Sequence, residues 1–443
     1  RNLHMFEYVT LKNFKSFENI TIDFRDRQKK AKPLILLLGP NGIGKSNIVS
    51  VFELLSDLFD TMNVRDFLES LLSRKDIDTK NQQFMMKYFH EQLKDIEDII
   101  RENKMIGSTD NMYIEFGFSI NEKSGTYIVE TNDTQIVHER LSYILVKNKS
   151  LYFDITQDKI NINRKLFATK ESYSTILESA KEYWGKHSIF SILMHEISDK
   201  TNEFMNEQLS ENLRDVISAL NNISCANHGY KKFFDSIIPS YSLKNLKNGE
   251  IDNSQLHTLQ KTEHVLNQFF TTMFPNIKNV YYKTTTNESI LEYTLYFKKQ
   301  IGSQIRDIHY KLESDGIAAL ISLFPLLLNS LDGITSVIDE FDNGLHEILS
   351  QSLLNSLQKY ITGQLILTTH NINLLDSDVL SEYVYIISED DDYNKHVQCI
   401  TETNQQIHAN SNRMKQYLEG KYQGLPQKAD INFDELRNYL RQN

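Results

Sequence analysis

Aliphatic-rich segments of five or six residues punctuate this chain. Three of them, at 33–38, 334–338 and 364–369, predict strands buried on both faces of a sheet, because their apolar positions show little alternation. Directly after the first segment, apolar residues recur with a helical period from Asn47 to Leu58. Strand followed by helix is the pattern of an α/β fold.

A second kind of pattern predicts half-buried strands. Apolar residues at 114, 116, 118 and 120 alternate with polar or small ones, which places them on one face of a strand. The segments 127–129, 141–146 and 151–153 extend this into an antiparallel meander, and two further short strands are predicted at 6–11 and 20–24. Together they predict an antiparallel β subdomain.

The strand pattern fades from about residue 170 to 275, where single apolar residues recur at spacings of three and four. This predicts a helical insertion without the heptads of a coiled coil. Strands return at 280–282 and 291–297, followed by an apolar helix at 317–331 that contains Pro325. We therefore predict an α/β fold with a mixed sheet flanked by helices, divided into a first lobe at 5–165, the insertion at 166–275, a second lobe at 276–400 and a tail at 401–443.

Composition limits the function classes. The 443 residues are 40% hydrophobic and 24% charged, as in ordinary soluble globular proteins. No run is long enough for a membrane span, no signal-peptide pattern is present, and Met5 is the expected natural start; we expect a cytoplasmic protein without a membrane partner. Two cysteines are too few for a disulfide framework or a zinc site. The net charge of −11 argues against a surface coated with basic residues for nucleic acid, although a local basic groove stays open.

The most specific motif follows the first buried strand. Residues 39–46 form a complete G-x-x-x-x-G-K-[ST] loop between that strand and the helix, so backbone N–H groups and a helix N-terminus face an anion. Lys45 can reach the outer phosphates, and the Ser46 hydroxyl can join the shell of a Mg²⁺ ion. The residues predicted to bind nucleotide here are Gly39, Asn41, Gly42, Gly44, Lys45, Ser46 and Asn47.

Polar side chains also follow the other two buried strands. Asp339 is placed to ligate Mg²⁺ directly or through water, and Glu340 to accept a proton from an attacking water. His370 ends the third strand, where it could orient that water or bind a γ-phosphate. Two solvated acids and a structural histidine are the alternatives, which the neighbouring phosphate loop disfavours.

A second anion cradle precedes the long apolar helix. The Ser314 hydroxyl, the Gly316 amide and the helix N-terminus can face a phosphate together. Because serine is also a favoured N-cap, this feature alone does not predict a phosphate site. Its position before Asp339 is what favours one.

In these motifs the chain resembles an ATP-binding-cassette (ABC) ATPase of the SMC/RecF/OLD class, with a P-loop NTPase head. The matching segments are Gly39–Ser46 (Walker A), 313–316 (signature), 337–340 (Walker B), 341–346 (D-loop) and His370 (switch histidine). The segment 11–17 resembles the first strand of that family. The tail at 417–426 resembles stand-alone bacterial ATPases of the RloA/AbiL group, which are associated with phage defence and often encoded beside an effector.

The resemblance implies a homodimer, or a higher even oligomer, that closes head to head around ATP and Mg²⁺. Lys45, Ser46 and Asp339 of one head would hold the nucleotide and metal. Ser314 and Gly316 of the other head would close on the γ-phosphate, and Asp342 would cross the interface. Because Asp315 adds a carboxylate at the signature, we expect slow hydrolysis.

Three functions are compatible with these features. The first is a defence ATPase that controls a separate nuclease or toxin effector in response to DNA or a phage-derived molecule. The second is a DNA-repair or chromosome-type ATPase that clamps DNA, as RecF does, and would stay on long duplex DNA only at low salt. The third is an ATP-bound scaffold with negligible turnover. The acidic run at 389–392 is expected to be a solvated loop, since too little chain follows for a nuclease domain of about 100 residues.

Overall fold

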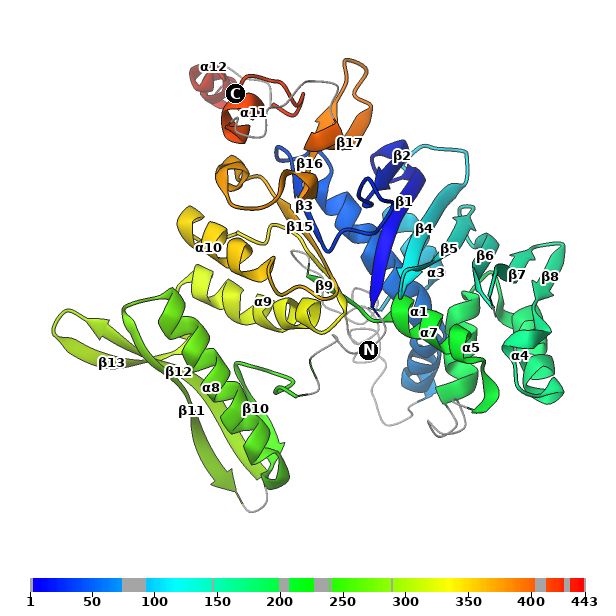
Figure 1. The fold of residues 1–443 in the computed structure, drawn as a ribbon, viewed down its shortest axis with the longest axis horizontal. Coiled ribbons are helices and arrows are strands. Elements are labelled where there is room, and N and C mark those ends of the chain that lie inside the picture. Colours follow the sequence, from blue (N-terminus) through cyan, green and yellow to red (C-terminus); the bar gives the residue numbers. More distant parts are fainter. Residues whose placement is uncertain are drawn as a thin grey trace.

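The computed structural model describes residues 3–73, 93–145, 147–198, 207–226, 239, 241–287, 290–402, 412–425 and 431–441. Three sheets dominate the described part of the chain (Figure 1). Parts of the predicted insertion (199–206 and 227–238) and of the predicted tail (403–411 and 426–430) lie outside the described residues. No helix within the described ranges combines the length and apolar character needed to cross a bilayer.

The central sheet has six strands in the order β17-β16-β3-β15-β14-β9. Its strands are parallel except for β17, which pairs antiparallel with β16 at one edge. The bounds are β3 (Leu34–Leu38), β9 (Ile223–Ala226), β14 (Thr335–Ile338), β15 (Gln364–Thr369), β16 (Val384–Glu389) and β17 (Lys395–Cys399). The three segments predicted as buried strands are β3, β14 and β15, which lie next to one another.

Both faces of this sheet are buried, which explains why its strands are aliphatic throughout. In β3, Ile35 and Leu37 join one hydrophobic core, while Leu34, Leu36 and Leu38 join a second core on the opposite face. Helix α1 (Lys45–Ser73) covers the first face, and α9 (Asp315–Leu331) and α10 (Glu347–Leu357) contribute to the core on the second. A strand packed on both faces needs no polar side.

The second sheet is antiparallel and packs on α1 in the hydrophobic core that also covers one face of the central sheet. Its order is β2-β1-β4-β5-β6-β7-β8, and the Phe6 ring meets the Phe52 ring of α1 edge to face, with centroids 5.0 Å apart. The strands are β1 (His4–Phe14), β2 (Phe17–Asp23), β4 (Met112–Ile120), β5 (Lys123–Thr131), β6 (Ile136–Ile144), β7 (Lys149–Thr156) and β8 (Lys159–Ile162). The predicted antiparallel subdomain is confirmed.

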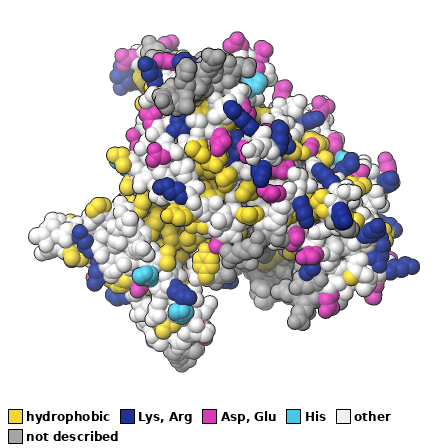
Figure 2. All heavy atoms as spheres, in the orientation of Figure 1, with side chains coloured by type: hydrophobic (Ala, Val, Ile, Leu, Met, Phe, Trp, Pro, Cys, Tyr) yellow, Lys and Arg dark blue, Asp and Glu magenta, His cyan; other side chains and the backbone are white. Residues whose placement is uncertain are grey.

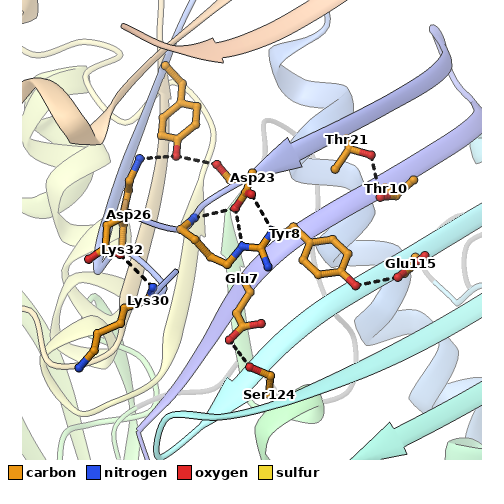
Figure 3. A network of polar contacts seen from close by, with 12 residues as sticks. Glu7, Tyr8, Thr10, Thr21, Asp23, Asp26, Lys30, Lys32, Glu115 and Ser124 are labelled. Carbon is orange, nitrogen blue, oxygen red and sulfur yellow. Dashed lines mark hydrogen bonds and ion pairs between the residues drawn. The ribbon is translucent and has the colours of Figure 1, made fainter. Parts of the chain in front are cut away.

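Buried polar contacts join the first two sheets near the start of β3. Lys32 Nζ donates to Tyr385 Oη of β16 at 2.8 Å, and that hydroxyl donates to the carbonyl of Asp23 at 2.7 Å (Figure 3). Arg25 holds the Asp23 carboxylate through Nε at 2.8 Å and through Nη2 at 2.6 Å. These bonds fix the strand that leads into the glycine loop.

The third sheet is a smaller antiparallel unit. Strand β12 (Ile290–Ile301) is its centre and pairs with β10 (Asn248–Asp252), β11 (Ile277–Asn287) and β13 (Gln304–His309). Helix α8 (Leu256–Met273) packs on this sheet through Leu259, Leu266 and Phe270. The unit projects from the body beside α9 (Figure 1).

The segment 166–275, expected to hold only helices, requires a correction. It contains α4 (Lys170–Tyr183), α5 (Ile189–Ser198), α7 (Glu211–Asn221) and α8, but also the strands β9 and β10. Strand β9 completes the central sheet beside β14. It was missed because its four residues include one large aliphatic side chain, Ile223, and because Ser224 is satisfied by a hydrogen bond from the distant Asn329 at 3.0 Å.

The remaining described helices are short. They are α3 (Ile96–Asn103), α11 (Arg413–Leu418), α12 (Phe433–Arg441) and the 3-10 helices η1 (Arg164–Leu166), η2 (Asn253–Gln255), η3 (Tyr310–Leu312), η4 (Ile372–Asp376), η5 (Ser381–Tyr383) and η6 (Ile400–Glu402). Helix α11 contacts η4, so the beginning of the described tail packs onto the second lobe.

Candidate nucleotide site

The glycine loop joins the end of β3 to the start of α1, as predicted. The Gly39 amide donates to the Thr369 carbonyl of β15 at 3.3 Å, which fixes the loop at the carboxyl edge of the sheet. Gly42 and Gly44 have φ values of 83° and 114°, which residues with a Cβ rarely adopt. A Cβ at Gly44 would also lie 3.3 Å from both Phe17 Cζ and Ser16 Oγ, so this position requires glycine.

Lys45 is the buried cation of the loop. Its residue is 5% exposed, and Nζ donates to the carbonyls of Gly39 at 2.8 Å and Pro40 at 2.9 Å. Burial lowers the pKa of Lys45, while the nearby carboxylates Glu340 and Asp339 act in the opposite direction. The ammonium group is thus held inside the loop, close to the predicted acidic residues.

Asp339 connects the loop to the Walker B strand. Its carboxylate accepts hydrogen bonds from Ser46 Oγ at 2.6 Å and from Thr368 Oγ1 of β15. Its backbone N–H donates to the carbonyl of Ala226 at 2.8 Å, at the end of β9. The two residues predicted to bind Mg²⁺, 293 positions apart in sequence, are therefore in direct contact.

Glu340 follows in an uncommon backbone conformation, with a φ of 46°. Its N–H donates to Thr368 Oγ1 at 2.8 Å, so one threonine hydroxyl positions both acids. His370 Nδ1 lies 3.9 Å from Glu340 Oε1, beyond hydrogen-bond distance, and the histidine side chain is 48% exposed. The predicted base and the predicted switch histidine are thus neighbours at the mouth of the site.

Asp342 differs from expectation. Instead of reaching outward to cross an interface, it is buried and accepts a hydrogen bond from Thr369 Oγ1 at 3.0 Å. Its second oxygen, Oδ1, is buried without a hydrogen-bond partner among the described residues. The reason is the turn after β14, which folds the side chain back under the end of β15.

Ser314 and Gly316 form a separate feature at the start of α9. Ser314 is exposed, and its side chain makes no capping hydrogen bond. A Cβ at Gly316 would lie 2.4 Å from the carbonyl oxygen of Gly344, so the signature turn and the turn after β14 are in close backbone contact. In the described part of the chain, no hydrogen bond joins Ser314 or Gly316 to the glycine loop of the same molecule.

Three residues near the loop were missed from the sequence. They are Thr368, described above, and the pair Ser16 and Lys395. Lys395 Nζ, from β17, donates to Ser16 Oγ at 3.0 Å, and Asn47 Nδ2 donates to the same oxygen at 2.7 Å. Ser16 lies in the segment 11–17 that resembles the family's first strand, but its place beside the loop, like that of Lys395, follows only from the contact between segments 379 positions apart.

The acidic run after β16 is an exposed hairpin turn, which confirms the prediction of a solvated loop. Asp390 accepts hydrogen bonds from the backbone N–H groups of Asp392 at 3.0 Å and Asn394 at 2.8 Å. Among the described residues, no cluster of three or more histidine, cysteine or acidic side chains could hold a metal ion.

Two features define the head of a P-loop ATPase. The glycine loop follows β3, and the acid pair Asp339 and Glu340 follows β14, two positions away in the same parallel sheet. The predicted fold class is therefore confirmed. Comparison with known families assigns the chain more closely. It belongs to the family described as "AAA domain, putative AbiEii toxin, Type IV TA system", which matches residues 34–376.

Solved structures similar to this chain include heads of SMC proteins. The SMC head domain from Thermotoga maritima has 15% identity and a TM-score of 0.38, covering 89% of this chain and 98% of that one. An SmcHead bound to the C-winged helix domain of ScpA has 16% identity and a TM-score of 0.43, with coverages of 89% and 98%. An Smc head with an extended coiled coil, bound to the C-terminal domain of ScpA derived from Pyrococcus furiosus, has 14% identity and a TM-score of 0.42, with coverages of 90% and 98%. A comparison with curated proteins gives no match.

Proposed function

We propose that this protein binds ATP with Mg²⁺ at the glycine loop and hydrolyses it. The observation that carries the proposal is the continuous set of contacts from Ser46 through Asp339 and Thr368 to Glu340. It joins a predicted metal ligand of the loop to the predicted general base. In phosphoryl transfer the protein contributes mainly positioning and charge stabilisation, which is what such a set of contacts provides.

The residues fit a magnesium–nucleotide complex. The Ser46 hydroxyl and the Asp339 carboxylate are oxygen donors of the kind that Mg²⁺ prefers, already held 2.6 Å apart. When bound, Mg²⁺ would neutralise charge on the phosphate oxygens. Lys45 would exchange its two carbonyl partners for phosphate oxygens, and the amides of the loop would cradle the phosphates.

The chain's own groups supply the proton transfer. Glu340 would accept a proton from the attacking water. The hydrogen bond from the Glu340 backbone N–H to Thr368 Oγ1 holds this residue in place. His370, half-exposed beside Glu340, would orient that water or contact the γ-phosphate.

Removing the ammonium of Lys45 by Lys45→Ala should abolish ATP binding, whereas Lys278→Ala, at an exposed lysine elsewhere, should not. Undiminished ATP affinity of Lys45→Ala would refute the site.

We further propose that two copies close head to head around ATP. Ser314 is exposed and makes no hydrogen bond to the loop of its own chain, so its hydroxyl is available to that of a second copy, while the buried Gly316 packs the signature turn against Gly344. Two large apolar side chains flank them at the surface: Leu312 is 76% exposed and Ile348, at the start of α10, is 68% exposed. Exposed apolar side chains beside a predicted binding surface are typical of an interface.

Finally, we propose that ATP turnover controls a separate effector in anti-phage defence. The family description, which names a putative AbiEii toxin and a type IV TA system, supports a role in such a system. The separate effector rests on the resemblance of the tail at 417–426 to ATPases that are often encoded beside one. Purifying the chain together with the proteins encoded beside it, and weighing the complex with and without ATP, tests this. An effector that joins or leaves with nucleotide supports the proposal, while a chain that never associates with any of them contradicts it.

A further inference from the structure

Away from the nucleotide site, α8 and α9 border an open groove of about 570 Å³. It lies where the small antiparallel unit meets the body of the molecule. Figure 2 shows hydrophobic side chains gathered over α9 at this junction, beside α8. Because α9 is the helix that starts at the signature residues, whatever occupies the groove contacts the element that carries Ser314 and Gly316.

The floor and walls of the groove are apolar. Helix α9 contributes Phe324, Pro325 and Leu328, and the opposite side contributes Leu246 and Val265. Val265 is 42% exposed, so the groove is open to solvent along α8 rather than closed. An open apolar groove between two helices suits a partner helix better than a small ligand, which usually has most of its surface enclosed.

The ionisable side chains along the groove are basic or neutral. His257, Lys261 and His264 line it from one face of α8, at spacings of four and three, and no carboxylate occurs among the described lining residues. None of the three makes an ion pair with a described residue. Among the described lining residues Lys261 carries the full positive charge at neutral pH, and with no carboxylate beside it in the lining it favours acidic side chains on a partner.

We propose that this groove binds an amphipathic helix of a partner protein, with its apolar face on α9 and acidic side chains toward Lys261. The lining residues of α8 span 257–265, about 12 Å or two helical turns, which matches anchors at i, i+3/i+4 and i+7 of a docked helix. The inference goes beyond the proposed function, since it depends on neither ATP hydrolysis nor dimerisation.

Two labelled helical peptides test the proposal by fluorescence anisotropy with the full chain. Both carry leucines at i, i+3, i+4 and i+7, and one has glutamates along one flank where the other has lysines. We expect the glutamate peptide to bind at least about tenfold more tightly, because like charges across an interface are costly. Lys261→Glu should reverse this preference, and Val265→Asp should abolish binding of both peptides.

Lys278→Glu is the matched control, because it makes the same charge reversal at an exposed lysine outside the lining. Unchanged melting temperature and ATP affinity of Lys261→Glu will establish that the variant is folded. Equal binding of both peptides, binding insensitive to Lys261→Glu, or binding of a small apolar dye at Val265 without either peptide would overturn the proposal. If the wild-type chain shows no ATPase activity, that result contradicts the proposed function and leaves the proposal for the groove unaffected.

Discussion

At the scale of single residues, Thr368 organises the candidate site. Its hydroxyl donates to the Asp339 carboxylate and accepts from the Glu340 N–H, so the predicted metal ligand and the predicted base share one support. The residue is fully buried, which leaves no water to replace it. Groups that orient metal ligands typically matter nearly as much as the ligands themselves.

Thr368→Val removes this hydroxyl while keeping the shape of the side chain. We expect kcat for ATP hydrolysis, or the affinity for Mg²⁺, to fall about 10- to 100-fold. Stability should fall by about 1–3 kcal/mol, because the Glu340 N–H loses its buried acceptor. A steady-state assay across Mg²⁺ concentrations measures the first effect. Thr362→Val, at an exposed threonine, is the control, and equal turnover of the two variants would exclude the assigned role.

Glu139 is a buried acid far from this chemistry. It is fully buried and accepts hydrogen bonds from Tyr127 Oη at 2.7 Å, Trp184 Nε1 at 2.8 Å and the Ile189 N–H at 2.9 Å. Burial raises the pKa of Glu139 to about 7, and these donors only partly offset it. The carboxyl group therefore binds a proton more tightly in the folded chain than in the unfolded one.

This raised pKa makes stability depend on pH. Because the pKa of Glu139 in the folded chain exceeds the unfolded value of 4.5, the protonated carboxyl group adds to the free energy of unfolding in full below pH 4.5. This stabilisation is lost as the pH rises to about 7. The free energy lost is on the order of 3 kcal/mol. Urea unfolding of the wild type and Glu139→Gln at several pH values measures it. The stability difference between them should change across this window, and a constant difference would show that the shift is absent.

At the scale of elements, both the success and the failure of sequence reasoning have physical causes. The strands β3, β14 and β15 were predictable because burial on two faces demands aliphatic residues throughout. The loop residues were predictable because their spacing in sequence is local. By contrast, β9 and Lys395 are defined by partners more than 100 positions away, and Asp342 was misplaced because its direction depends on how one turn folds.

The start of α9 and the turn after β14 are in close backbone contact, between Gly316 and Gly344. Gly316→Ala would place a Cβ 2.4 Å from the Gly344 carbonyl oxygen, so the helix start must shift. We expect a loss of about 1–3 kcal/mol in stability together with reduced ATP turnover. Ser314→Ala should reduce turnover with little change in stability, since this side chain makes no capping bond. Thermal melts in which Gly316→Ala matches the wild type would contradict the close packing.

At the scale of the whole molecule, the proposed dimer places Leu312 and Ile348 between the two heads. Replacing either by aspartate buries a charge against apolar surface, and we expect dimer affinity to fall about tenfold or more for each change. ATP binding to the single head should persist, because neither residue contacts the glycine loop. Leu380→Asp, at a similarly exposed leucine, should not affect association. ATP-dependent association that is insensitive to Leu312→Asp and Ile348→Asp would place the interface elsewhere.

The most direct test of the account is the mass of Glu340→Gln with saturating ATP and Mg²⁺, measured by analytical ultracentrifugation. Removing the proton acceptor while leaving the phosphate loop intact should trap the nucleotide-bound state. We predict a species of twice the 51.7 kDa chain mass that reverts to the single chain in Lys45→Ala. A single chain of 51.7 kDa with nucleotide demonstrably bound would contradict the claim that a second copy completes the site.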